Sequence, residues 1–452
     1  MAVILAAQDC ARLHSEQSVH ARRIGGQPVA ARVRAVLQEA GVGALACVVG
    51  DRQEQVRAVL GEDMAYVLQE ERLGTGHAAL QAASFLESRR GLTLVVPGDA
   101  PLLTTATVCR ALETFVAEDL DCLLLVAKAG DPGPVRLLTA EAAEEIVAVR
   151  RSAAGTEREL EVSSGFYVFR TTILLSVLGR MRFAEDGRLD LAACLPILVA
   201  DGRRAATLGM PPAEARHVRS VGDLVFAERI LSQREAQRLL DAGVELQRPE
   251  TSVIEAGVKV APDTRIAPDV TLLGATEIGP GCDIERGVVL ENASIGPGCH
   301  VGPHAVIRNS EVGRDCDIGP GVCLRDGAWI DRKTRIAAGA EIANAVIGRR
   351  VTIEAHVSLV DCDVGSDSRV GAGTVTANYD TGGQSQRTTI GQMAVVGSNT
   401  TLVAPLEIGD NAVIAAGSVI TESVGSFALA IARQRQSTLE DWVRRRRQRR
   451  GG

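Results

Sequence analysis

The feature that most constrains this fold is a six-residue repeat in the second half of the chain. From Val260 onward, aliphatic residues recur at intervals of six with occasional slips, and many precede glycine, as in the IGPG segments. The repeat positions are Ile266, Ile278, Ile284, Ile295, Val301, Val312, Ile318, Leu324, Ile330, Ile336 and Ile342, then Ile390, Val396, Leu402, Ile408, Ile414 and Ile420. Six residues cannot make a helical repeat, but they suit one short strand plus a turn. The repeat therefore predicts a solenoid of three-sided coils, with one inward aliphatic side chain on each side.

The first half of the chain has a different pattern, in which short apolar runs alternate with helical periodicity up to about residue 220. The runs at 44–51, 92–99 and 121–128 predict buried strands, and apolar residues at helical spacing follow Pro28. This alternation predicts a mostly parallel sheet with helices on both faces, whose ligands lie at the carboxyl ends of the strands. The segment 222–243 predicts one helix that joins the halves, since Gly243 ends it and Pro249 prevents its resumption.

Composition limits the class of protein. A length of 452 residues suggests two or three domains, and 46% hydrophobic with 23% charged residues is globular composition. The net charge of −7 argues against a general nucleic-acid binder. Ten single cysteines, without a C-x-x-C pair, indicate reduced thiols. With no signal peptide or membrane-spanning run expected, we predict a soluble cytoplasmic protein, and we interpret the basic run at 443–450 as a solvated end.

Seven local motifs give the chain a family resemblance: LAAQDCARL, QEERLGTGHAAL, PGDAPLL, LRDGA, GAGTVTANYD, VVGSNTTLVAPLEIG and VIAAGSVI. Over nearly its whole length the chain resembles the bifunctional N-acetylglucosamine-1-phosphate uridyltransferase/glucosamine-1-phosphate N-acetyltransferase family, GlmU. The resemblance implies an α/β Rossmann-like nucleotidyltransferase domain followed by a left-handed parallel β-helix of hexapeptide repeats. The implied domains are a pyrophosphorylase domain at 1–222, a linker helix at 223–245 and an acetyltransferase domain at 246–452.

For the first domain, the resemblance implies a UDP-sugar site at Leu5, Ala6, Ala7, Arg12, Gln69, Gly74 and Thr75. Asp99 matches the family's Mg²⁺ ligand; its second ligand, an asparagine, aligns with Gly222, and the neighbouring Asp223 could supply an oxygen. Other positions depart from the family. Gln8 and Cys10 replace loop glycines, Val19 replaces a lysine, and the sugar-binding positions hold Val135, Arg150 and Ser163.

For the second domain, the resemblance implies acetyl-CoA contacts at Ala372, Ser398, Ala416 and Arg433, acetyl and sugar contacts at Asn378 and Tyr379, and a sugar-phosphate contact at Arg325. The family's catalytic histidine aligns with Ala355, and His356 comes one residue late. In a strand, this shift would send the side chain to the opposite face, whereas a local slip would restore it. We take His356 as the candidate general base. A phosphate-binding lysine, a tyrosine and an asparagine of the family align with Ala343, Ser358 and Arg369.

The implied function is synthesis of UDP-N-acetylglucosamine, a cell-wall precursor. The enzyme would acetylate glucosamine-1-phosphate from acetyl-CoA and then transfer UMP from UTP, with Mg²⁺, as a homotrimer that contacts neither nucleic acid nor membrane. The residues that the resemblance implies for binding uracil and CoA are kept, whereas many of those implied for binding the sugar or for catalysis are replaced. Two alternatives therefore stay open: a divergent paralogue that acts on another sugar phosphate, and a non-catalytic trimeric scaffold that binds nucleotide or CoA.

Overall fold

The structure is a computed structural model that describes residues 1–8, 13, 15–127, 136–143, 162–378 and 385–448. The chain forms two compact units, Met1–Leu231 and Ser232–Gly452. The division falls inside α9 (Val221–Asp241), the helix predicted at 222–243. The domain boundaries given above remain predictions.

The first unit is built on an eight-stranded sheet with the strand order β5-β4-β1-β6-β9-β7-β10-β8. Its strands are β1 (Ala2–Ala6), β4 (Leu45–Val49), β5 (Ala65–Leu68), β6 (Leu92–Pro97), β7 (Cys122–Ala127), β8 (Arg136–Leu137), β9 (Val162–Arg170) and β10 (Ala205–Met210). The first four in this order pair in parallel, which agrees with the predicted topology. The long strand β9 was not predicted, and it pairs antiparallel to both β6 and β7.

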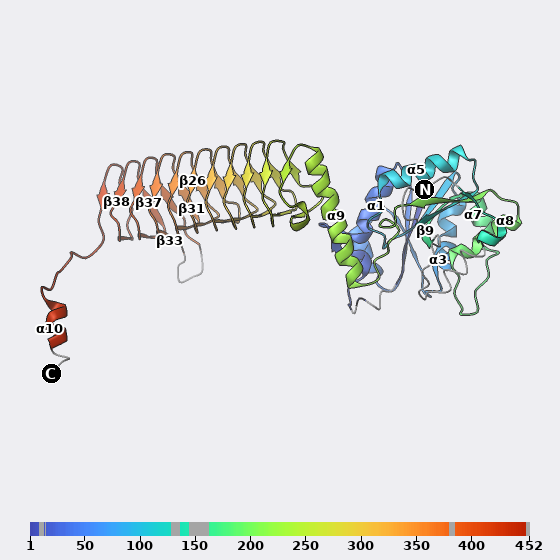
Figure 1. The fold of residues 1–452 in the computed structure, drawn as a ribbon. Coiled ribbons are helices and arrows are strands. Elements are labelled where there is room, and N and C mark those ends of the chain that lie inside the picture. The colour runs from blue at the N-terminus through green and yellow to red at the C-terminus, as the bar shows by residue number, and fades with distance from the viewer. Residues whose placement is uncertain (9–12, 14, 128–135, 144–161, 379–384, 449–452) are drawn as a thin grey trace. The chain divides into compact units, whose positions relative to one another are not determined.

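Helices cover both faces of this sheet (Figure 1). Neighbouring residues of one strand point to opposite faces, so Val3 belongs to the core on one side of the sheet, which includes residues of α3 (Thr75–Gln81), α4 (Ala83–Glu87), α7 (Thr171–Leu178) and α8 (Cys194–Ala200). Ile4 belongs to the core on the other side, which includes residues of α1 (Val29–Glu39), α2 (Gln53–Leu60) and α5 (Thr105–Ala117). A short hairpin of β2 (Arg23–Ile24) and β3 (Gln27–Pro28) precedes α1.

The second unit contains a parallel β-helix with three flat sheets (Figure 1). The eleven-stranded sheet runs from β11 (Glu245–Leu246) to β40 (Leu429–Ala430), and the ten-stranded sheet from β12 (Val253–Ile254) to β39 (Val419–Ile420). The nine-stranded sheet runs from β13 (Lys259–Val260) to β37 (Leu406–Ile408). The predicted solenoid of three-sided coils is thus confirmed.

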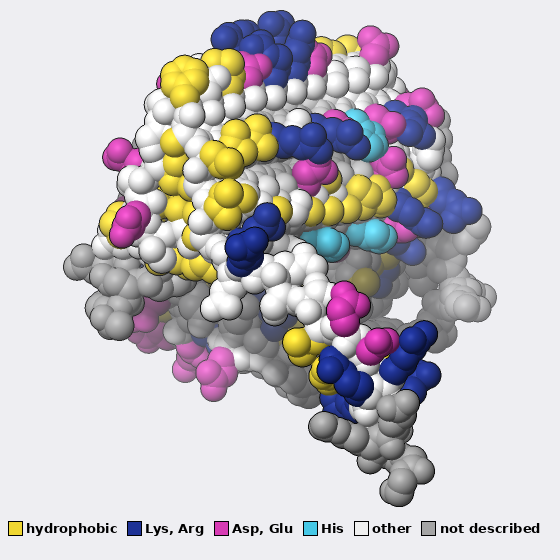
Figure 2. Space-filling view, turned by 90° about the vertical axis from the view of Figure 1, so that its left-hand side faces the viewer, with side chains coloured by type: hydrophobic (Ala, Val, Ile, Leu, Met, Phe, Trp, Pro, Cys, Tyr) yellow, Lys and Arg dark blue, Asp and Glu magenta, His cyan; other side chains and the backbone are white. Residues whose placement is uncertain are grey.

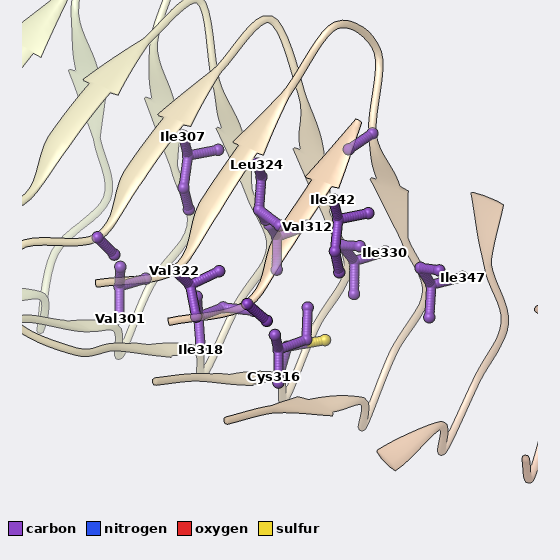
Figure 3. Close-up of a cluster of buried hydrophobic side chains, with 14 of the residues drawn as sticks. Val301, Ile307, Val312, Cys316, Ile318, Val322, Leu324, Ile330, Ile342 and Ile347 are labelled. Atoms are coloured by element: carbon purple, nitrogen blue, oxygen red, sulfur yellow. The ribbon is translucent and has the colours of Figure 1, made fainter. Parts of the chain in front are cut away.

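The repeat residues form the core of the β-helix. Successive coils stack in register, so that Ile284 pairs with Val301 and Val301 with Ile318. These side chains are fully buried, and Figure 3 shows Ile307, Leu324 and Ile342 pointing inward from one sheet toward the others. Burying one such side chain is worth roughly 1.5–3 kcal/mol, so the aliphatic columns are the main source of stability.

Charged side chains face outward on the β-helix and pair between neighbouring coils. Examples are Lys259 with Glu277 and Arg265 with Asp283, each at 2.6 Å. Figure 2 shows basic and acidic side chains lying beside one another on this surface. The described chain ends in α10 (Trp442–Gln448), which carries the basic run. The nine cysteines within the described ranges are all free thiols. No described helix has the length and apolar character needed to cross a bilayer.

Candidate functional site

A small hollow of about 100 Å³ lies at the carboxyl ends of β1 and β4. The predicted residues Ala6 and Ala7 line it, together with Gln8, Ser18 and Arg72. The Leu5 carbonyl instead accepts a hydrogen bond from the Gly98 N–H at 2.8 Å, which connects the ends of β1 and β6. Arg12, predicted for the same site, lies outside the described residues.

Gln69, Gly74 and Thr75 form a second group, at the end of β5 and the start of α3. The Gln69 side chain is buried, and its Nε2 donates to the Gly74 carbonyl at 3.3 Å and contacts His77 Nδ1 at 2.9 Å. Gly74 has a φ of 110°, and a Cβ there would lie 2.7 Å from the Leu189 carbonyl oxygen. Only glycine fits this position without strain. With Nε2 used internally, Oε1 is the atom of the Gln69 amide left for a ligand.

Asp99 follows β6 and is 1% exposed. Its Oδ1 lies 2.7 Å from His217 Nδ1, and His217 Nε2 lies 3.0 Å from the Ser164 carbonyl oxygen in β9. Burial raises the pKa of Asp99, but the charge and hydrogen bond of His217, with His20 and Arg219, outweigh it and lower the pKa below its usual value. Within the described ranges, Asp99 Oδ2 is buried without a hydrogen-bond partner.

This orphaned oxygen fits the Mg²⁺ that the family resemblance implies. Among the residues that the structure describes, no three His, Cys, Asp or Glu side chains are grouped to hold a metal on their own. Mg²⁺ commonly uses one or two carboxylates and takes its remaining ligands from water and substrate phosphates. One free Asp99 oxygen meets that minimum.

The other predicted metal ligand, Asp223, is already engaged at the start of α9. Its Oδ1 accepts from Arg216 Nε at 2.9 Å, and its Oδ2 accepts from Ser220 Oγ at 2.7 Å and from the Arg219 N–H at 3.2 Å. Ser220 Oγ also accepts from the Asp223 N–H at 3.2 Å. The contacts with Ser220 and the Arg219 N–H cap the helix, and a metal at Asp223 would compete with its ion pair to Arg216.

Three of the predicted acetyl-CoA contacts align at one corner of the β-helix, which we call the Ser398 corner. It consists of the turn pairs Ala338–Gly339, Ala355–His356, Ala372–Gly373, Ser398–Asn399 and Ala416–Gly417, one pair per coil. The Asn399 N–H donates to the Ala372 carbonyl and the Gly417 N–H to the Ser398 carbonyl, both at 2.8 Å. Arg433 completes the group, since its Nη1 donates to the Ala416 carbonyl at 2.9 Å.

His356 also lies at the Ser398 corner, but in a turn and not in a strand. The strand-alternation argument therefore does not apply to it. Ala355, where the family's histidine aligns, is in register with Ala372, because the Gly373 N–H donates to the Ala355 carbonyl at 3.1 Å. His356 takes the following position, with a left-handed φ of 56°, and its exposed ring lies against Gly339 of the preceding coil.

Arg325 and Asn378 lie along a different corner, at the carboxyl edge of the ten-stranded sheet. Arg325, in β24 (Cys323–Arg325), donates from Nε and Nη2 to one Glu341 oxygen at 3.1 and 2.8 Å and also pairs with Asp326. Its charge is therefore balanced within the chain. Asn378 donates to Asp361. Tyr379 lies outside the described residues.

Sequence reasoning missed Asp361 and Arg387 at this edge. Asp361 accepts from Asn344, Asn378 and Ser385; burial raises its pKa, but these hydrogen bonds and Arg387 bring it below the usual value. Arg387 makes a two-point contact with Asp363 and donates to the Asn344 carbonyl at 3.1 Å. The available signal was the asparagine or aspartate that recurs once per coil at this corner, at Asn309, Asp326, Asn344 and Asp361. Their convergence depends on coil register, which no short motif encodes.

Protein-family models match three segments: a MobA-like NTP transferase domain at 2–163, a GMPPB C-terminal domain at 249–329, and the bacterial transferase hexapeptide (six repeats) at 387–422. Among solved structures, a nucleotidyl transferase from Methanothermobacter thermautotroptrophicus matches 50% of this chain and 94% of its own, with 19% identity and a TM-score of 0.37.

Relatives that align with this chain over nearly their whole length are named bifunctional protein GlmU. The bifunctional protein GlmU of Acetivibrio thermocellus is 32% identical over 450 residues, which cover 98% of this chain and 97% of the relative. That of Trichlorobacter lovleyi is 34% identical over 454 residues, covering 99% and 98%. That of Streptococcus pyogenes serotype M5 is 35% identical over 454 residues, covering 98% and 97%. With such identity along nearly the whole of both sequences, the chain belongs to the GlmU family.

Proposed function

We propose that this chain is a bifunctional enzyme that acetylates glucosamine-1-phosphate from acetyl-CoA and transfers UMP from UTP to the N-acetylated product. The observation that carries the proposal is the full-length similarity to proteins named bifunctional GlmU, which extends through both the sheet unit and the β-helix. We further propose that the active form is a homotrimer and that it works in the cytoplasm, where UTP and acetyl-CoA are available.

In the uridylyl-transfer half, Gln69 reads the base. Its Nε2 is held by Gly74 and His77, so Oε1 is free to accept the imide N–H that uracil carries and cytosine lacks. Asp99 Oδ2 would hold Mg²⁺, which would supply neutralisation of charge on the phosphate oxygens. Ala6 and Ala7, with their small side chains, let the nucleotide approach the end of β1 closely.

In the acetyl-transfer half, the Ser398 corner binds the CoA carrier. Ala372 and Ala416 leave room at the turns, and the exposed Arg433 guanidinium can pair with a CoA phosphate. His356 is the candidate base that takes the proton from the attacking ammonium group. The backbone N–H of His356 donates to the Ala338 carbonyl at 3.0 Å, whereas its ring nitrogens make no hydrogen bond among the described residues and are available.

A second candidate function, acetylation of a different acceptor, is favoured by one observation. Arg325, the predicted phosphate contact, is already paired with Glu341 and Asp326. The position of the family's lysine is occupied by Ala343, which is in register with Arg325. A phosphate there would therefore meet two nearby carboxylates, with alanine at the position of the family's lysine.

The two half-reactions, assayed separately on the full-length protein, test the proposal. One assay supplies acetyl-CoA with glucosamine-1-phosphate and follows free thiol. The other supplies UTP, Mg²⁺ and N-acetylglucosamine-1-phosphate and follows pyrophosphate. We expect turnover in both. Uridylyl transfer without acetylation of glucosamine-1-phosphate would favour the second candidate, and a screen of amino-sugar phosphates would then identify the acceptor. Absence of both activities would overturn the proposed function.

A further inference from the structure

We propose that His217 is a positioning residue for the metal site of the uridylyl-transfer half, because it fixes the orientation of the Asp99 carboxylate. The inference rests on the proposed function, because it takes Asp99 as the carboxylate that holds the divalent cation. His217 belongs to no motif of the resemblance and comes 118 residues after Asp99.

The His217 ring lies between the Asp99 carboxylate and the Ser164 carbonyl and contacts both, an arrangement that we call the His217 brace. Its Nδ1 lies 2.7 Å from Asp99 Oδ1, and its Nε2 lies 3.0 Å from the Ser164 carbonyl oxygen. Both Asp99 and Ser164 are buried, and the His217 side chain is 12% exposed. Because a carboxylate oxygen can only accept, Nδ1 is the donor to Asp99, and the carboxylate cannot rotate without breaking this short hydrogen bond.

This brace determines which Asp99 oxygen is available. Oδ1 is occupied by His217, whereas Oδ2 is buried and has no partner within the described ranges. The carboxylate therefore offers one oxygen in a fixed orientation. Asp223, the alternative second residue, already accepts hydrogen bonds at both oxygens, from Arg216 at Oδ1 and from Ser220 and the Arg219 N–H at Oδ2. Outer-shell partners of this kind typically change metal affinity by about 10- to 100-fold when they are removed.

Two substitutions separate the contacts of the two ring nitrogens. In His217→Asn, the amide nitrogen takes the place of Nδ1 and keeps the donor to Asp99. In His217→Gln, it takes the place of Nε2 and keeps only the contact with Ser164. Binding of Mn²⁺ alone is measured on the full-length protein from the electron paramagnetic resonance signal of free Mn²⁺. Comparison with Asp99→Asn gives the part of the Mn²⁺ binding that depends on Asp99. His304→Ala, in the β-helix, controls for loss of an imidazole. Circular dichroism and thermal melting verify folding.

We expect His217→Asn to stay close to the wild-type affinity for Mn²⁺, and His217→Gln to lose about 10- to 100-fold. If His217→Gln kept the affinity for Mn²⁺ and His217→Asn lost it, the contact of His217 with Ser164 in β9 would matter and its contact with Asp99 would not, which overturns the proposal. Equal binding by both variants and wild type would also overturn it, as would Mn²⁺ binding that does not depend on Asp99. Calorimetric titration with UTP distinguishes these outcomes from failure of the proposed function, because UTP binding persists if only the role of His217 is wrong.

Discussion

His356 follows Ala355, the position where the family's catalytic histidine aligns, at the Ser398 corner. Whether a histidine at this neighbouring position can act as the general base is open to a direct test. Ala355 is in register with Ala372 and Ser398, whereas His356 takes the left-handed position of the turn. If His356 is the base, His356→Ala should lower the rate of acetyl transfer by about a hundredfold or more. Its exposure predicts little change in melting temperature. The measurement is kcat for acetyl-CoA consumption.

His304 offers a matched control for this test. It occupies the equivalent left-handed position three coils earlier, with a φ of 60°, and its ring lies against Gly287 as that of His356 lies against Gly339. His304→Ala should leave the rate unchanged. Equal rates for both variants and wild type would show that the base is another residue.

Arg433 provides a second residue-scale prediction, on binding and not on chemistry. A hydrogen bond to a charged group is worth roughly 1.5–3 kcal/mol, so Arg433→Ala should weaken acetyl-CoA binding by about 10- to 100-fold. Arg445→Ala, in the basic α10, is the control, because we interpret that run as solvated. Calorimetric titration with acetyl-CoA measures both. An equal loss in the two variants would indicate general attraction by positive charge.

Among the elements, the stacked strands of the β-helix carry its stability. In β29 (Thr352–Ile353), Ile353 is fully buried and its neighbour Thr352 faces outward. Ile353→Ala should lower the free energy of unfolding by about 2–5 kcal/mol, and Thr352→Ala by much less. Both tryptophans, Trp329 and Trp442, belong to the second unit, so their emission during urea titration follows its unfolding. Equal effects would contradict the inward register of Ile353.

The outer face of the eleven-stranded sheet adds a pH-dependent contribution. His300 in β20 (His300–Val301) lies between Glu285 and Asp317. Burial lowers the pKa of His300, but the hydrogen bonds and charges of these carboxylates raise it above its usual value. The contribution to stability is therefore full below the unfolded pKa of about 6.5 and is lost as the pH rises through the higher folded value. His300→Gln should reduce the melting temperature at about pH 5.5 but scarcely at about pH 9. A reduction independent of pH would contradict this account.

For the molecule as a whole, the elements that repeat along the sequence could be predicted, whereas contacts between residues far apart in the sequence could not. The spacing of Ile266, Ile284 and Ile318 predicted both the coils and their inward faces, because each side of a coil repeats the same local geometry. The alternating runs likewise predicted the parallel part of the first sheet. The antiparallel strand β9 was missed, since no local signal gives the direction of a distant partner.

The candidate site shows the same division. The family resemblance supplied Ala372, Ser398 and Ala416, and the register of the coils aligns them at the Ser398 corner. The contact between Asp99 and His217 joins residues 118 positions apart. A single histidine outside every quoted motif does not indicate which distant residue it will contact. The strand argument against His356 failed because the sequence did not distinguish strand from turn at that residue.

We expect one chain to keep two binding sites, one for UTP in the sheet unit and one for acetyl-CoA at the Ser398 corner. Calorimetric titration of the full-length protein with each ligand in turn tests this most directly. It should show one UTP site and one acetyl-CoA site per chain, with acetyl-CoA affinity unchanged by saturation with UTP. A folded protein that binds neither ligand would contradict the account.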